Sequence, residues 1–243
     1  MYIKSDLYDL INELNNNWVP IILNIIKSMD SLIDPFLRLY NKEQKNNPNF
    51  KDIFKSFKNT DPNKISVIIL YKPTFREEER KRIILTEMYE EYKHEIITSK
   101  ETFLYNYNFN NLQKQGVLIL NYYLTWTQGD MEPHKKFWST FMSNLFTHMH
   151  QNYKFIVYLL WDTELDSIEK IIKDGSSTSI NKKTDKEKRE IISYLILKIN
   201  PLPQRNNNSS YLQKSRFIGS NHFIITNHYL KSWHKPMIKW VCA

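Results

Sequence analysis

The chain has 243 residues, of which 41% are hydrophobic; this fits one large α/β domain or two small ones and excludes a disordered chain. Its 34 basic residues outnumber its 26 acidic ones, and the net charge of +8 favours polyanionic partners, nucleic acid before an anionic membrane surface. The single cysteine, Cys242, excludes a disulfide framework and a cysteine-based metal cluster, and it indicates a reducing compartment.

The N-terminal region carries no targeting pattern. It lacks the charged-then-apolar order of a signal peptide, and the longest apolar stretch, Trp18 to Ile26, is interrupted by Asn24. We therefore expect an intracellular protein that is neither secreted nor membrane-spanning.

Apolar residues recur at helical spacing in two N-terminal segments. The first runs from Leu7 to Leu14 behind Ser5, the expected N-cap, and the second runs from Ile22 to Ile33 with Pro20 near its start. Both patterns predict packing helices, and we treat residues 1–45 as an N-terminal helical segment of a single domain spanning residues 1–243.

Four apolar runs have the length and β-branching of strands buried on both faces, which is typical of a parallel sheet. They cover residues 65–70, 116–121, 155–161 and 193–199. Helical patterns separate them, at Glu77 to Ile97, Phe137 to Gln151 and Glu164 to Lys173. The alternation predicts an α/β fold: a central, mainly parallel four-stranded sheet flanked by helices, with functional loops at the carboxyl ends of the strands. Residues 176–188 and 204–210 are polar and predict surface loops.

The second strand and the residues after it carry a specific motif. Lys114 to Asn121 is followed by Leu124 and Thr125, then by His134 and Lys135. This order resembles the signature of the family-1 uracil-DNA glycosylases, in which a KQGVLLLN strand precedes LT, SHK and a tryptophan-bearing helix. Further segments resemble the family's FLLWG, GCRHFSKTN and PIDW motifs in the same order, so the resemblance covers roughly residues 50 to 240; these segments are Val157 to Trp161, Gly219 to Asn227 and Pro236 to Trp240.

The resemblance implies that both catalytic side chains are replaced. The family's VVILGQDPYH motif corresponds to Val67 through Arg76, which places Pro73 at the position of the catalytic aspartate. Proline has no carboxylate to steady an oxocarbenium-like sugar or to position water. The HPSPLS motif corresponds to Asn200 through Arg205, so Asn200 stands where a histidine would hydrogen-bond the departing uracil oxygen.

The same alignment leaves remnants of a uracil pocket. Asn121 matches the asparagine that reads the uracil edge, although a role in capping a loop is equally open, and Phe75 matches the tyrosine that excludes thymine. The segment that carries the family's stacking phenylalanine is missing, and the chain enters a charged helix start at Glu77 instead.

A basic rim near the strand ends is the expected DNA contact, although any one of these lysines could equally be ordinary solvated charge. Gln204 aligns with the leucine that wedges into the base stack, and Tyr211 or Leu212 could replace it. The expected DNA-contacting residues are His134, Lys135, Lys136, Lys182, Lys183, Gln204, Arg205, Tyr211, Leu212, Lys214, Arg216, Asn221 and His222.

Three functions follow as hypotheses. The first is a DNA-binding, catalytically inactive uracil-DNA glycosylase homologue at the nucleus or a cytoplasmic site of viral replication, because some poxvirus members of the family bridge DNA and polymerase without base excision. The second is an active glycosylase with a relocated carboxylate, Asp130 or Asp162. The third is a protein-binding scaffold. No cofactor is expected, and no metal either, because His148 and His150 lie on different faces of a helix.

Overall fold

The computed structural model describes residues 1–43, 46–127, 130, 132–180, 194–202 and 216–241. Three helices open the chain: α1 (Lys4–Asn12), α2 (Val19–Ser28) and α3 (Asp30–Lys42). Ser5 is not the N-cap of α1, because the N-cap is two residues earlier, at Ile3, whose amide donates to the Asp6 carboxylate at 2.7 Å. The second predicted helix is two helices, since the backbone leaves helical geometry at Met29.

The main sheet consists of four strands, β2 (Val67–Tyr71), β3 (Val117–Asn121), β5 (Ile156–Leu160) and β6 (Tyr194–Lys198). Their order is β3-β2-β5-β6 and every neighbouring pair is parallel, which confirms the predicted fold. A two-stranded antiparallel sheet, β1 (Asn46–Asn47) with β4 (Trp126–Thr127), was not predicted.

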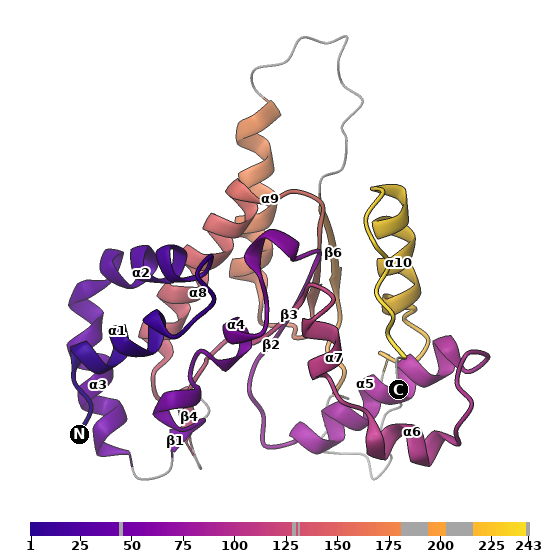
Figure 1. Cartoon of the computed structure of the whole chain (residues 1–243), viewed down its shortest axis with the longest axis horizontal. Helices are drawn as coiled ribbons and strands as arrows, with labels where there is room; N and C mark the ends of the chain where they lie inside the picture. The colour runs from indigo at the N-terminus through magenta and orange to yellow at the C-terminus, as the bar shows by residue number, and fades with distance from the viewer. Residues whose placement is uncertain (44–45, 128–129, 131, 181–193, 203–215, 242–243) are drawn as a thin grey trace, which may run out of the picture.

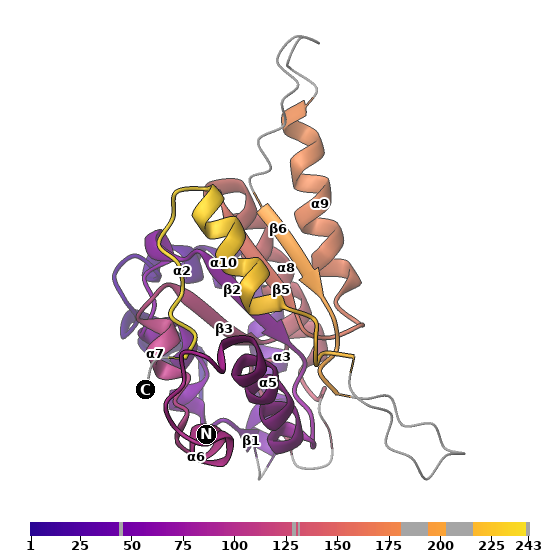
Figure 2. The same cartoon turned by 90° about the vertical axis from the view of Figure 1, so that its right-hand side faces the viewer.

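The two faces of the sheet bury alternate residues against different helices. Ile68 and Leu70 belong to a core shared with α1, α2, α3 and α8 (Lys135–Asn152). Val67 and Ile69 pack into a second core with α5 (Glu77–Tyr92) and α10 (His222–Ser232). Figure 1 shows these helices on opposite sides of the sheet, and Figure 2 shows α10 lying across it.

Gly116 allows the backbone turn that leads into β3. Its φ is +87°, and a Cβ there would lie 2.3 Å from the Lys64 carbonyl oxygen, so a larger residue does not fit. The Gly116 carbonyl accepts the amides of Ser66 and Val67 and thereby fixes β3 beside β2.

The helices between the strands differ from the predictions mainly at their ends. The predicted helix 77–97 ends at Tyr92, before the polar residues 93–95, and α6 (Lys100–Asn106) and α7 (Asn110–Gln113) follow it. The loop predicted at residues 176–188 is wrong over 176–180, because α9 (Asp166–Ile180) continues there. Short turns η1 (Phe50–Asp52), α4 (Lys55–Lys58) and η2 (Pro62–Lys64) precede β2. Among the helices that the structure describes, none is long and apolar enough to cross a bilayer.

Candidate functional site

A cavity of about 380 Å³ opens at the carboxyl edge of the sheet. Its walls come from the end of β3, from the residues that follow β2 and β3, and from the segment 47–56, which includes parts of β1, η1 and α4. The lining residues are Asn47, Pro48, Asp52, Ile53, Lys55, Ser56, Pro73, Thr74, Glu77, Asn121, Leu124 and Trp126. A volume of this size is enough for one nucleobase or a similar small polar ring.

Asn121 is the last residue of β3 and pairs in register with Tyr71 of β2. Its Oδ1 atom is buried and has no hydrogen-bond partner among the described residues. A buried, unpartnered amide oxygen costs free energy unless a ligand donates to it. Asn121 is therefore the cavity residue best placed to read a ligand's polar edge.

Pro73 and Phe75 lie in different surroundings in the structure. Pro73 is buried and lines the cavity with Asn121, so the position that the alignment assigns to the catalytic aspartate lies in this wall, and it carries no acid. Phe75 is 65% exposed and is not among the cavity-lining residues, so its ring does not form the wall that the alignment predicts.

Glu77 brings a carboxylate to the cavity that the sequence reasoning missed. It pairs with Arg80, and Arg80 also donates to the Lys72 carbonyl at 2.5 Å and lies 4.0 Å over the Tyr71 ring. Burial raises the pKa of Glu77, and Arg80 opposes that shift. Asp52 and Lys55 contribute one further charge of each sign to the walls.

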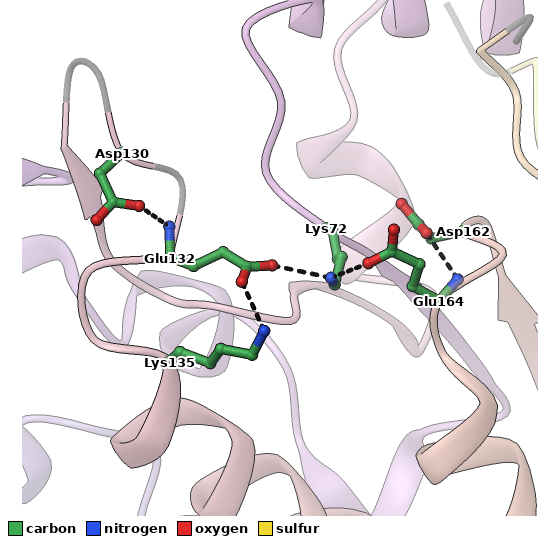
Figure 3. Close-up of polar contacts among 6 residues, drawn as sticks. All are labelled: Lys72, Asp130, Glu132, Lys135, Asp162 and Glu164. Atoms are coloured by element: carbon green, nitrogen blue, oxygen red, sulfur yellow. Dashed lines mark hydrogen bonds and ion pairs between the residues drawn. The ribbon is translucent and has the colours of Figure 1, made fainter.

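Lys72 ties together the segments that follow three strands (Figure 3). Its Nζ lies 2.9 Å from Glu132 and 2.5 Å from Glu164, and Glu132 also pairs with Lys135 at 2.7 Å. Burial alone would lower the pKa of Lys72, but the hydrogen bonds to Glu164 and Glu132 outweigh it and raise the pKa. The Lys135 and Lys72 hydrogen bonds lower the pKa of Glu132 to about 2. We call these four residues the lysine clamp.

The two carboxylates proposed as relocated catalytic groups do not line the cavity. Asp130 is exposed and its Oδ1 accepts the Glu132 amide at 2.8 Å. Asp162 occupies the glycine position of the FLLWG motif, and its Oδ1 accepts the Glu164 amide at 2.9 Å (Figure 3). Burial raises the pKa of Asp162.

Both histidines expected at the DNA surface are buried instead. His134 is 3% exposed because Phe36 and Tyr40 of α3 cover it, and its Nδ1 lies 2.8 Å from the Thr125 hydroxyl. His222 is 6% exposed, and its Nδ1 accepts the Trp161 indole N–H at 3.2 Å. Burial lowers the pKa of each to about 4, so both are neutral at pH 7.

The remaining expected contacts divide into exposed residues and residues outside the described ranges. Lys135, Lys136, Arg216 and Asn221 are exposed, although Lys135 is engaged in the lysine clamp. Asn200 is half-buried and its Oδ1 accepts the Leu202 amide at 2.9 Å. The expected contacts outside the described residues are Lys182, Lys183, Gln204, Arg205, Tyr211, Leu212 and Lys214.

The sequence did contain signals for part of what was missed. Lys72 and Glu77 flank the Pro73 motif, so their nearness to the cavity follows from chain adjacency. Glu132 and Glu164 belong to loops after other strands, and only the tertiary fold brings them to Lys72. No group of three potential ligands is placed to hold a metal ion within the described ranges.

Comparison with known proteins gives a partial sequence match and a likeness of fold. No family model matches the chain. A uracil-DNA glycosylase from Fusobacterium nucleatum is 28% identical over 128 residues, which is 52% of this chain and 46% of that protein, so the match spans about half of the relative's length.

The solved structures extend the likeness to nearly the whole chain. Mimivirus uracil-DNA glycosylase superposes with a TM-score of 0.65 at 18% identity, covering 95% of this chain and 88% of the other. The wild-type enzyme from Nitratifractor salsuginis gives 0.53 at 16% identity, covering 96% and 94%. The fold is that of the uracil-DNA glycosylases. The partial sequence match is likewise to a uracil-DNA glycosylase.

Proposed function

We propose that this protein binds DNA with little sequence preference, holds an unstacked base in the cavity at Asn121, and does not excise that base at a rate useful for repair. The observation that carries the proposal is that Asn121 and Pro73 line the same cavity. Asn121 lines the cavity with an unpartnered amide oxygen, while Pro73, two residues after the end of neighbouring β2, offers no acid. Recognition of a base is retained in this arrangement and its hydrolysis is not.

The chemistry of glycosidic hydrolysis explains why Pro73 is decisive. An oxocarbenium-like sugar needs a nearby carboxylate, and a departing base needs a hydrogen-bond donor for its developing charge. Asn200 matches the position of that donor in the alignment; its Oδ1 accepts the Leu202 amide in a local turn, and its amide NH2 is a weaker donor than an imidazole. The net charge of +8 and the exposed Lys136 and Arg216 support phosphate contacts.

The test is fluorescence anisotropy with two labelled oligonucleotides that differ in a single uracil. Wild type is expected to bind both at low salt and to lose affinity steeply as salt rises. Asn121→Ala should weaken binding of the uracil-containing strand about 3- to 10-fold, the cost of one or two hydrogen bonds, and leave the other strand unchanged. Asn24→Ala, at an exposed position of α2, is the matched control. Absence of binding to either strand would favour the scaffold hypothesis.

A second candidate function is residual glycosylase activity that uses a displaced carboxylate. Glu77 favours it, because this carboxylate lines the cavity and Asp130 and Asp162 do not. If wild type releases uracil, Glu77→Gln should abolish the release and Asp130→Asn and Asp162→Asn should leave it intact. Loss of release in either aspartate variant with full activity in Glu77→Gln would rule out this role for Glu77.

A replication role, with the protein bridging DNA and a polymerase in a virus-infected cell, is a proposal by analogy with family members that act without base excision. Its support is that this chain has the fold of the uracil-DNA glycosylases and a net charge of +8, while position 73 carries a proline in place of an acid. Purified polymerase that gains processivity on addition of this protein would support the role; unchanged processivity at saturating protein would contradict it.

A further inference from the structure

A second cavity of about 630 Å³ lies against the C-terminal end of α3, and nothing in the proposed function uses it. Its lining includes Asn46, Asn49 and Phe50, whereas the first cavity is lined by Asn47, Pro48 and Asp52. The two cavities therefore share one short segment as a common wall and have no lining residue in common.

Two cations on one helix face mark one side of this cavity. Arg38 and Lys42 stand four residues apart on α3, both are exposed, and neither forms an ion pair within the described chain. Glu43 also lines the cavity, so these three side chains sum to +1. That balance suits a singly or doubly charged phosphate group.

A rigid aromatic platform marks another side. Tyr2 stacks on Phe50 with ring centroids 3.9 Å apart and an interplanar angle of 8°, and Tyr40 meets both rings edge-on. Phe50 is only 3% exposed, whereas Tyr2 remains 42% exposed. The Tyr2 ring is therefore backed by the core and still accessible, which is the geometry on which a nucleobase stacks.

A fixed acceptor completes the set. The Asn46 amide nitrogen donates to the carbonyls of Tyr40 at 2.7 Å and Glu43 at 3.1 Å. These two bonds set the orientation of the amide. The remaining Oδ1 is buried and has no partner among the described residues, so it lacks a donor such as a base amine would supply.

From these three features we propose that the second cavity binds a nucleotide, with its base on Tyr2, a donor of the base at Asn46 and its phosphate at Arg38 and Lys42. The nucleotide comes either free from solution or as one residue of a nucleic-acid strand. Only the strand source rests on the proposed function. In that case the shared wall at residues 46–53 allows one strand to occupy both cavities.

The experiment measures binding of the full chain to fluorescent deoxyadenosine monophosphate and, separately, to a labelled single-stranded oligonucleotide without uracil. Tyr2→Ala should weaken binding about tenfold or more, the usual contribution of one stacked base, and Tyr2→Phe should stay within about twofold of wild type. The double variant Arg38→Ala/Lys42→Ala should lose at least about tenfold. Its matched control is Lys27→Ala/Lys231→Ala, which removes the same charge from exposed positions elsewhere; all variants are first checked for an unchanged melting temperature.

The pattern across the probes identifies the source. If mononucleotide binding is saturable, weakened by Tyr2→Ala and retained in Tyr2→Phe, the ligand is a free nucleotide. If only oligonucleotide binding responds to these two variants in this way, the ligand is one residue of a strand. Equal losses in both double variants, or no saturable binding of either probe, would overturn the proposal. Asn121→Ala separates the two claims, because it should change binding of a uracil-containing strand and leave the mononucleotide unaffected.

Discussion

At the residue scale, a single position accounts for most of the expected loss of chemistry. Pro73 lies in the wall of the cavity, and our alignment assigns it to the position of the family's catalytic carboxylate. Removing one well-placed transition-state group typically costs about a hundred- to a thousand-fold in rate. Here a second group, at Asn200, is replaced as well, so the losses compound.

We predict that Pro73→Asp alone does not restore uracil release and that Pro73→Asp with Asn200→His restores only a small fraction. The added aspartate would face the cavity, but the departing base would still lack its donor in the single variant. The measurement is release of uracil from a labelled oligonucleotide, with Pro73→Asn as an uncharged control for the loss of proline. Family-like turnover by Pro73→Asp would show that the rest of the site is intact.

The strand pattern predicted Asn121 as the last residue of its strand, and Pro73 lies two residues after the end of β2, because both positions follow from strand pattern and motif order. The prediction failed for His134 and His222 for a physical reason. His134 stands between Pro133 and Lys135, a local sequence that is typical of a surface position. Packing of Phe36, from α3 far away in the sequence, buries it. Burial of this kind depends on contacts that no local pattern encodes.

At the element scale, α5 holds the start of α10. The Glu87 carboxylate accepts the amides of Gly219 at 2.6 Å and Asn221 at 2.9 Å, and Glu91 accepts that of Ile224 at 2.7 Å. The free amides at a helix N-terminus need acceptors, and here Glu87 and Glu91 supply the acceptor oxygens. Exposed Asn221 was expected to contact DNA, but its backbone serves this cap.

We predict that stability falls as pH rises from about 5 to 8. Burial, opposed by the backbone amide of Ile224 and reinforced by the Glu87 charge, raises the pKa of Glu91 to about 8. The folded protein thus holds a proton that the unfolded chain releases near its ordinary pKa, so the stabilisation is full below about 4.5 and is lost through about 8. Glu91→Gln should flatten this slope in thermal melts across pH. Glu78→Gln, exposed on the same helix, should not change it.

The predictions for elements succeeded where periodicity is strong. The four strands and α8 have long apolar patterns, and all five are present within two residues of their expected ends. The break at Met29, the short helices α6 and α7 and the extension of α9 to Ile180 involve polar or short segments. In such segments tertiary contacts, rather than local propensity, decide the structure.

At the scale of the whole molecule, the charge is unevenly placed. The chain carries +8 overall, yet the lysine clamp puts Glu132 and Glu164 at the edge of the sheet beside the cavity (Figure 3). The Glu164 side chain is 71% exposed. A phosphate backbone crossing this edge meets carboxylates as well as lysines, which should moderate DNA affinity.

We therefore predict that Glu164→Gln tightens DNA binding by about two- to threefold at low salt and that the difference disappears at high salt. Lys72 keeps its contact with Glu132, so the clamp is not lost. Glu101→Gln on exposed α6 is the control for a change of one charge. Unaltered affinity in Glu164→Gln across the salt series would place the DNA away from this edge.

The measurement that tests the central claim most directly is uracil release by the wild-type protein from an oligonucleotide that it demonstrably binds. With neither catalytic side chain in place, we predict a bound and intact oligonucleotide with no uracil released over hours. Multiple turnovers by the wild-type protein at saturating DNA would contradict the claim that recognition persists here without excision.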